Sequence, residues 1–183
     1  MISPYVVPVA RLLRDVPSVT EVSFEAPFDE AGEFEPRGPA ETDVWPDATV
    51  SVRLRLESYP GGLRARGRVG VPWHGVCRRC SVAVTGASDV AVAERFVTPA
   101  DPVDEEAYPI DGDVIDLRQL VHDAVLLDLP LAPLCRSDCR GLCPVCGIDR
   151  NEATCECQPV SDPRWATLDE LRFTDLPDDV GGV

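Results

Sequence analysis

The stretch ATVSVRLRLESYPGGLRARGRVGV, residues 48–71, alternates apolar or small side chains with polar ones on both sides of a turn signal. Apolar residues occupy every second position from Val50 to Leu56, and apolar or small ones do so from Leu63 to Val71. This period of two is typical of half-buried β-strands. Between the two runs, residues 59–62 read Tyr-Pro-Gly-Gly, the composition of a tight turn. The stretch therefore predicts an antiparallel hairpin with one buried face.

The flanking sequence extends the hairpin into a larger sheet. Residues 5–9 and 82–96 predict further strands, and residues 10–15 predict a short helical turn. We expect a loop over residues 25–47, rich in Pro, Gly and acidic side chains, and an acidic linker over residues 99–116. An amphipathic helix should follow, capped by Asp116, with its apolar residues at helical spacing: Leu117, Leu120, Val121, Ala124 and Val125.

The expected fold class is α+β. A twisted antiparallel sheet, open or partly closed, would carry one or two packed helices and a cysteine-rich zinc-binding C-terminal module. The expected domain order is a sheet domain (1–98), the linker (99–116), the helix (117–134), the cysteine-rich module with a final helix starting near Trp165 (135–173), and a tail (174–183).

The charge balance limits the classes of partner. The chain has 17 basic and 32 acidic residues, a formal net charge of -15, and every base is Arg. Such a chain repels nucleic acid at long range, so contact with RNA would need a local basic face or a basic partner. The N-terminus shows no signal-peptide pattern, and the longest apolar stretch, residues 124–134, is too short to cross a bilayer. We therefore expect a cytoplasmic protein with no membrane partner.

Eight cysteines, the number that two four-sulfur sites require, are the most specific chemical signal. Residues 143–147 read Cys-Pro-Val-Cys-Gly, a tight turn that aims backbone amides at two thiolates able to bind one tetrahedral ion. The preferred partition places Cys143, Cys146, Cys155 and Cys157 in one zinc site, and Cys77, Cys80, Cys135 and Cys139 in the other. A single zinc ion, with the first pair left as ordinary thiols, is the alternative.

Other interpretations of the thiols fit less well. The Cys139-x3-Cys143-x2-Cys146 spacing occurs in iron–sulfur radical enzymes, but fewer than 40 residues follow it here. Cys77 and Cys80 lack the βαβ context of a redox pair, and a disulfide framework does not suit a cytoplasmic chain. His74 is either a metal ligand or a hydrogen-bond donor to one near Cys77, or a solvent-facing loop residue, which we favour. His122 is expected to be half-buried on the helix.

A second set of residues carries positive charge on one side of the hairpin. We call Arg53, Arg55, Arg64, Arg66 and Arg68 the arginine face, with Arg78 and Arg79 following at its far end. Guanidinium groups at strand spacing can bind successive phosphates, so all seven are candidate RNA-binding residues. The alternative is a solvated face neutralised by the acidic loops. No aromatic residue interleaves with these arginines, and Trp73 and Trp165 are expected to be core or cap residues, so base stacking is not predicted.

Together these motifs resemble the YceD family, the large ribosomal RNA subunit accumulation proteins. The resemblance covers residues 5–171. It rests on Cys77-Arg-Arg-Cys80, the acidic linker before the helix, the run from Leu129 to Gly147, Asn151, and Asp162-Pro-Arg-Trp165. It implies a non-enzymatic ribosome biogenesis factor that supports accumulation of large-subunit (23S) rRNA, with no catalytic residues and with one or two zinc ions as stabilisers. Cys155 and Cys157 are the least typical pair.

The expected partners follow from these features. The protein would bind large-subunit rRNA or its assembly intermediates through the arginine face, or a basic ribosomal protein through acidic loops such as Asp104, Glu105 and Glu106. No small-molecule substrate is expected. The alternative function is a zinc-binding protein-interaction adaptor or regulator without a ribosomal role.

Overall fold

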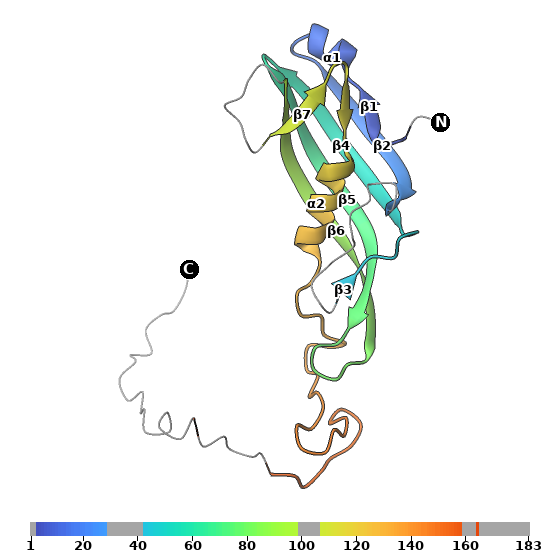
Figure 1. The fold of residues 1–183 in the computed structure, drawn as a ribbon, viewed down its shortest axis with the longest axis vertical. Helices are drawn as coiled ribbons and strands as arrows, with labels where there is room; N and C mark the ends of the chain where they lie inside the picture. The colour runs from blue at the N-terminus through green and yellow to red at the C-terminus, as the bar shows by residue number, and fades with distance from the viewer. Residues whose placement is uncertain (1–2, 29–41, 99–106, 159–163, 165–183) are drawn as a thin grey trace. The chain divides into compact units, whose positions relative to one another are not determined.

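The computed structural model describes residues 3–28, 42–98, 107–158 and 164. The chain forms two compact units, Met1–Cys139 and Arg140–Val183. All helices and named strands of the described residues belong to the first unit (Figure 1). None of these helices is both long and apolar enough to span a membrane.

The first unit is built on one curled sheet. Its strand order is β1-β8-β7-β6-β5-β4-β2, and β3 pairs with β5 off this path. All pairs are antiparallel except β6 with β7, which is parallel. The strands are β1 (Val6–Pro8), β2 (Val19–Pro27), β3 (Thr42–Asp43), β4 (Thr49–Tyr59), β5 (Gly62–Val76), β6 (Ala83–Val97), β7 (Tyr108–Asp111) and β8 (Val114–Asp116).

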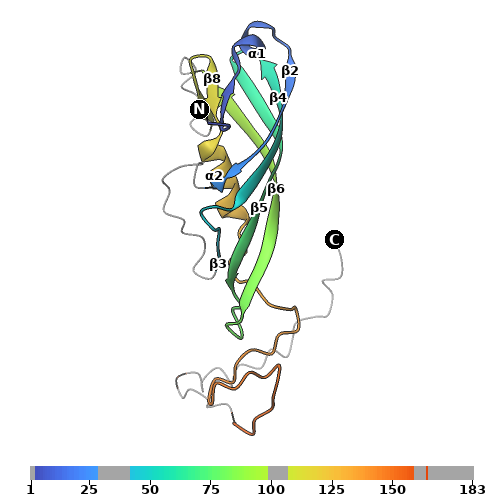
Figure 2. The same cartoon turned by 90° about the vertical axis from the view of Figure 1, so that its right-hand side faces the viewer.

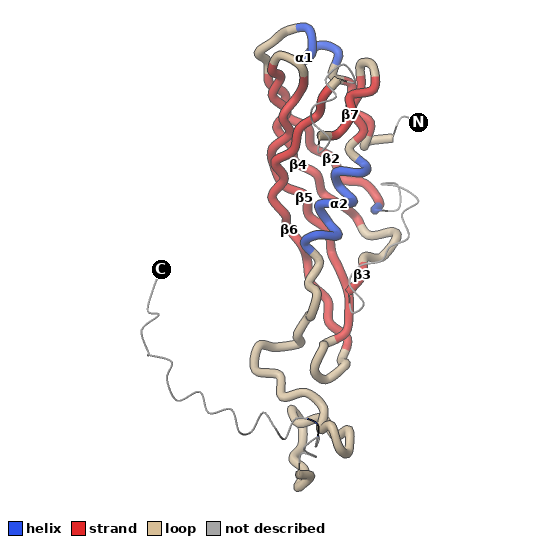
Figure 3. The backbone as a smooth tube through the Cα atoms, turned by 60° about the vertical axis from the view of Figure 1, so that its left-hand side comes forward, coloured by secondary structure: helices blue, strands red, loops and turns tan. Residues whose placement is uncertain are grey.

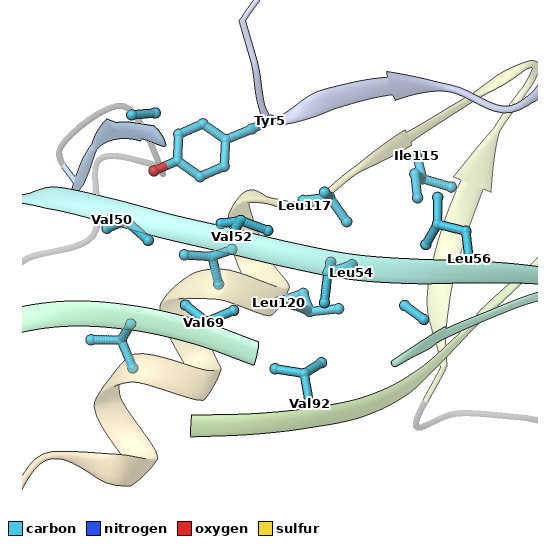
Figure 4. Close-up of a cluster of buried hydrophobic side chains, with 14 of the residues drawn as sticks. Tyr5, Val50, Val52, Leu54, Leu56, Val69, Val92, Ile115, Leu117 and Leu120 are labelled. Atoms are coloured by element: carbon cyan, nitrogen blue, oxygen red, sulfur yellow. The ribbon is translucent and has the colours of Figure 1, made fainter. Parts of the chain in front are cut away.

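The predicted hairpin is confirmed as β4 and β5, in the register that the alternation requires. Gly61 in the connecting turn has φ +97°, a left-handed conformation that favours glycine. Val50, Val52, Leu54 and Leu56 are buried on one face, while the arginines between them are exposed. Their side chains point into a core shared with Leu117 and Leu120 (Figure 4). Burial of this face supplies the main hydrophobic stabilisation of the unit.

Two helices accompany the sheet, α1 (Ala10–Arg14) and α2 (Arg118–Asp128). Figures 2 and 3 show α2 against one face of the long strands β4, β5 and β6. Its buried residues include Leu120, Val121 and Val125, which join the sheet core. The Asp116 carboxylate accepts a hydrogen bond from the Arg118 backbone N–H (3.0 Å), which stabilises the first turn as expected, although Leu117 is the N-cap residue.

The sheet curls so that its two ends approach each other. The Tyr5 hydroxyl, just before β1, donates to the carbonyl oxygen of Pro27 in β2 (3.0 Å). The Tyr5 and Phe24 rings make an edge-on contact with centroids 5.2 Å apart. These contacts join the first and last strands of the sheet order without a backbone ladder. The result is a half-barrel, consistent with the partly closed sheet expected from the sequence.

The structure corrects several expected element boundaries. Residues 25–27 end β2 and residues 42–43 form β3, so the expected loop at 25–47 is shorter; residues 29–41 lie outside the described residues. β7 and β8 occupy residues 108–116, which we expected to be linker. Within the expected segment 117–134, α2 ends at Asp128, next to Leu129-Pro130, where the sequence places the end of the helix. The compact units divide after Cys139, so Cys135 and Cys139 belong with the sheet. The final helix expected from Trp165 also lies outside the described residues.

The second unit, as far as it is described, consists of turns. A single antiparallel bridge joins Leu142 to Asp149. Residues 140–158 contain only two buried residues, Gly141 and Cys143. So small an apolar interior cannot offset the conformational entropy of ordering residues 140–158, so these residues require another source of stability.

Candidate metal centres and the arginine face

The first cysteine tetrad lies in the sheet unit and consists of Cys77, Cys80, Cys135 and Cys139. Its four sulfur atoms lie within 4.8 Å of one another. The Sγ atoms of Cys77 and Cys139 are 3.8 Å apart, and those of Cys80 and Cys135 are 3.7 Å apart. Four sulfurs held about 2.3 Å from a tetrahedral zinc ion lie about 3.8 Å from each other, so the thiols fit that ion.

The first tetrad joins segments far apart in the sequence. Cys77 and Cys80 occupy the turn between β5 and β6, whereas Cys135 and Cys139 follow α2. Leu134 and Val84 pack against the buried cysteines in a small cluster separate from the main core. The Arg79 guanidinium donates a hydrogen bond to the carbonyl oxygen of Cys139 (2.8 Å). This bond links the two segments independently of a metal ion.

The second tetrad lies in the second unit and consists of Cys143, Cys146, Cys155 and Cys157. Its sulfur atoms also lie within 4.8 Å of one another. The eight thiols thus divide four and four as the preferred partition predicts, and Cys155 and Cys157 lie with the others. Because all four donors are thiols in each case, both groups suit a closed, structural zinc site with no position left for water.

The two Cys-x-x-Cys turns have the same backbone hydrogen bonds. The Cys77 N–H donates to Val82 O and the Ser81 N–H donates to Cys77 O, both at 2.8 Å. In the second turn, the Cys143 N–H donates to Ile148 O (2.8 Å) and the Gly147 N–H to Cys143 O (2.9 Å). The fifth residue is left-handed in both, with φ +58° at Ser81 and +73° at Gly147. In the first turn, Ser81 therefore has a left-handed backbone conformation that favours glycine.

This turn geometry changes the acidity of the thiols. Burial raises the pKa of Cys77, but hydrogen bonds from the backbone amides of Cys135, Cys80 and Arg79 outweigh it, and the pKa falls to about 6. Backbone amides of Cys146 and Val145 likewise lower the pKa of Cys143 to about 6, against the effect of burial. One thiol in each tetrad is therefore ready to bind a cation as thiolate at neutral pH.

A second thiol in each tetrad is shifted the other way. Loss of solvent raises the pKa of Cys135 to about 12, and the neighbouring thiols add to this shift. The hydrogen bond with Cys146, followed by burial, raises the pKa of Cys157 to about 12. Four thiolates without a cation would repel one another, so each tetrad keeps protons until a dication replaces them.

Hydrogen bonds of Asn151 organise the second unit around its thiols. The Asn151 side-chain carbonyl accepts from the Arg140 N–H (2.8 Å). Its backbone N–H and its side-chain amide both donate to the Asp149 carboxylate, at 2.8 and 2.7 Å. The Arg150 N–H donates to the carbonyl oxygen of Gly141 (2.9 Å). These bonds close the loop that carries Cys143 and Cys146.

Neither histidine belongs to a tetrad. His74 lies on β5 with its ring 4.3 Å from that of Trp45, so it is a strand residue rather than the expected loop residue. His122 is 8% exposed, more buried than expected, and its ring is parallel to Phe28 with centroids 6.1 Å apart. Both rings pack against aromatic side chains.

The five residues of the arginine face share the outer face of the sheet. Arg53 lies opposite Arg68, and Arg55 opposite Arg66, in the β4–β5 register. Arg64 pairs across the sheet with Arg95 of β6, an exposed arginine that the sequence reasoning missed although its position follows the same alternation. Directly opposed like charges destabilise a sheet. On the same face, however, Glu57 lies opposite Arg64 and Glu21 of β2 lies opposite Arg55, which offsets part of this charge.

Two of the five arginines form ion pairs with other described residues. Arg55 pairs with Glu57 (Nε–Oε1 2.9 Å) and Arg68 with Asp89 (Nε–Oδ1 2.8 Å). The hydrogen bond from Arg68 lowers the pKa of Asp89, so this pair stays charged at neutral pH. No ion pair among the described residues involves Arg53, Arg64 or Arg66. Both acids lie on strands, and neutralisation by the acidic loops stays a prediction, because residues 29–41 and 99–106 lie outside the described residues.

Arg78 and Arg79 lie at the first tetrad, in the turn after β5. Because the Arg79 guanidinium contacts the Cys139 carbonyl oxygen, it has a structural role there. Their part in RNA binding stays a prediction, as does that of the five face residues. The expected acidic contact residues 104–106 lie outside the described residues.

Comparison with known proteins relates these sites to a family. Residues 65–172, which include both tetrads, match the family model described as "Large ribosomal RNA subunit accumulation protein YceD". The chain belongs to the YceD family. The matched region of this YceD protein also includes Arg66 and Arg68 but begins after Arg53, Arg55 and Arg64. No solved structure gives a significant match.

Three relatives illustrate the range of similarity. An uncharacterized protein of Mycobacterium tuberculosis is 40% identical over 129 residues, 68% of this chain and 62% of the relative. This YceD protein thus spans less than two thirds of that relative's length. An uncharacterized protein of Mycobacterium leprae is 32% identical over 175 residues, 92% of this chain and 73% of the relative. "Large ribosomal RNA subunit accumulation protein YCED homolog 1, chloroplastic" of Arabidopsis thaliana is 30% identical over 70 residues, 38% of this chain and 22% of the relative.

Proposed function

We propose that this YceD-family protein is a non-enzymatic ribosome biogenesis factor that supports accumulation of large-subunit (23S) rRNA in the cytoplasm. The family description and the name of the Arabidopsis relative both refer to large-subunit rRNA. The geometry suggests how the protein takes part: the arginine face contacts rRNA phosphates in assembly intermediates. A binding role without catalysis accords with cysteine sites that have only thiol donors.

The single observation that supports this proposal best is the set of three exposed arginines with no ion pair among the described residues. Arg53 lies on β4, whereas Arg64 and Arg66 lie on the neighbouring β5. Neighbouring strands of a sheet are about 4.8 Å apart. Glu57 lies opposite Arg64 in the β4–β5 register but is ion-paired with Arg55. A phosphate chain would add counter-charge to this face, and each contact would release condensed cations from the RNA. The net charge of -15 opposes approach from a distance, so binding would depend on this local patch.

Zinc in both tetrads would complete the fold. Cys77, Cys80, Cys135 and Cys139 would hold one ion, and Cys143, Cys146, Cys155 and Cys157 the other. When bound, the dication would offset two of the four thiolate charges and crosslink the segments that carry them. The first site would fix the chain after α2 to the β5–β6 turn, at the end of the strands that also carry the arginine face.

Sedimentation of cell extract tests the role in ribosome assembly. We expect the protein to co-migrate with precursors of the large subunit, and crosslinking in those fractions should recover large-subunit rRNA. Depletion of the protein should lower 23S relative to 16S rRNA. Protein that stays at the top of the gradient, with an unchanged rRNA ratio after depletion, would reject the proposal.

A second candidate function is a protein-interaction adaptor, favoured by a groove between α2 and β6. This groove of about 190 Å³ has Glu94, Asp123 and Asp128 in its lining together with the apolar Val92 and Leu127. Leu127 is 87% exposed. Acidic and apolar groups together suit a basic amphipathic segment of another protein. Purification of crosslinked complexes that contain protein but no rRNA would favour this function.

A further inference from the structure

An aromatic pair lies on the same outer face of the sheet as the arginines. The Trp45 and His74 rings have centroids 4.3 Å apart, with an angle of 33° between their planes. Trp45 is 39% exposed, although a tryptophan gains most by burial. The two rings come from different segments: Trp45 follows β3, and His74 lies on β5 opposite Asp43. Sequence alternation could not show this pairing because β3 has only two residues.

The strand pattern places His74 in line with the arginine face. Alternate residues of a strand share a face, so His74 lies on the side of Arg64, Arg66 and Arg68, while Trp73 lies on the other. Trp73 packs on its cross-strand neighbour Gly86, where an added Cβ would lie 2.4 Å from the indole ring. His74 follows Arg68 along the strand at a distance of about 20 Å, from the rise of a strand per residue.

A shallow hollow occupies the surface between these two features. It has a volume of about 320 Å³ and is lined by residues that include Arg53, Arg68 and Pro72. Its remaining lining is mostly small or uncharged, with Ser51 and Gly70 among these residues. Asp89 also lines it, but that carboxylate is occupied by Arg68. The hollow ends at Pro72, two residues before His74 on β5. The arginines, the hollow and the aromatic pair therefore follow one another along one face, and we call them the strip.

We propose that this strip binds a single-stranded segment of RNA, with phosphates on Arg53 and Arg66 and one unstacked base on the Trp45 ring. The proposal rests on the proposed function and specifies the form of RNA recognised. Bases stack on aromatic side chains only where they are free of a duplex, and every base has a π face, so the contact needs no particular sequence. His74 supports the indole from behind and holds its orientation.

The test measures binding of the zinc-loaded full-length chain to three labelled probes of equal length: oligouridine, an abasic oligomer with the same phosphates, and an RNA duplex. We expect the wild type to bind oligouridine most tightly. Trp45→Ala should weaken oligouridine binding between about 5-fold and 150-fold, the range of one base–aromatic stack. The same variant should leave abasic binding and the salt slope unchanged, because the phosphate contacts remain.

Two further variants separate stacking from folding and from charge. Trp45→Phe keeps an aromatic face and should retain most of the oligouridine preference. Arg53→Glu with Arg66→Glu should weaken binding of all three probes. Two outcomes would show that the stacking proposal is wrong while the proposed function stands. In the first, Trp45→Ala weakens binding of the abasic oligomer and of oligouridine equally. In the second, Trp45→Ala changes the binding of neither probe, whereas the arginine variant weakens the binding of both. If polyglutamate displaces oligouridine as well as unlabelled RNA does, the strip fits an acidic protein, which also overturns it. Absence of RNA binding in the wild type would reject the RNA contact in the proposed function itself.

Discussion

Arg64 and Arg66 are exposed on β5 and form no ion pair among the described residues, so they are the residues best suited to test phosphate binding. Changing both to Glu should weaken binding to large-subunit rRNA fragments. It should also reduce the slope of log affinity against log salt by about 0.7 for each single-strand phosphate that the variant no longer neutralises. Binding titrations at several salt concentrations measure both quantities. Folding should change by only about half a kcal/mol, because both positions are exposed.

A matched control separates local contact from net charge. Arg11→Glu with Arg14→Glu makes the same change in charge on α1, outside the arginine face, where Arg11 is a solvated partner of Asp15. This control should leave the salt slope as in the wild type. An equal loss of affinity in both double variants would show that overall charge, rather than the arginine face, governs binding.

The pKa values of individual thiols predict how the folding stability of the metal-free, reduced protein depends on pH. The pKa of Cys77 is about 6 in the fold and 9.0 ordinarily, so its stabilisation is full above pH 9 and is lost as the pH falls through 6. The pKa of Cys135 is raised to about 12, so its stabilisation is full below pH 9 and is lost as the pH rises to 12. Stability should therefore be greatest near pH 9.

Urea unfolding followed by circular dichroism, with a chelator and a reductant present, measures this profile. Cys77→Ser should reduce the rise in stability between pH 6 and pH 9, to which Cys143 also contributes, and leave the fall above it. A profile that is flat across this range in the wild type would contradict the lowered pKa of Cys77.

At the scale of elements, the two units differ in what stabilises them. Residues 140–158 bury only Gly141 and Cys143, whereas the sheet has an extended apolar core. Cys143→Ser should therefore remove hydrogen-exchange protection from residues 140–158, because the energy of metal binding is the folding energy of that unit. Protection of β4 and β5 should persist. Equal loss of protection in both regions would show that the second tetrad supports the whole chain.

The first tetrad belongs to the sheet, so its loss should have a different effect. Cys77→Ser with Cys80→Ser frees the chain after α2 from its metal link to the β5–β6 turn, where hydrogen bonds such as that from Arg79 to Cys139 remain. The variant provides the control for Cys143→Ser in the same exchange experiment. Protection should fall around residues 77–84 and 133–139 and remain at residues 140–158.

For the whole molecule, the division of the thiols predicts the metal content. Protein purified under reducing conditions should contain two zinc ions per chain, because each group of four sulfurs lies within 4.8 Å. Elemental analysis measures this ratio directly. Cys77→Ser with Cys80→Ser should lower it to one. One ion per chain in the wild type, with no change in that variant, would show that the first tetrad does not bind metal.

Short-range patterns in the sequence were enough to predict several features of the molecule. The period of two between Val50 and Val71 predicted the hairpin and its buried face, and helical spacing from Leu117 predicted α2. The Cys-x-x-Cys spacings predicted two tight turns, and the count of eight thiols favoured two sites. These features could be predicted because neighbours in the chain decide them. The alternation of Thr20, Val22, Phe24 and Ala26 also carried the signal for β2, although we expected part of this strand to be a loop.

Apart from the partition of the cysteines, which distant residues meet became clear only from the tertiary structure. In the folded protein Arg68 pairs with Asp89, whereas Arg66 is exposed without an ion pair among the described residues. Arg79 contacts the Cys139 carbonyl oxygen, and the Trp45 ring lies against that of His74. The fold also forms β7 and β8 within a stretch that composition alone assigned to a linker. Such contacts depend on strand order and register across the whole sheet, and short strands gain their stability from partners far along the chain rather than from their own residues.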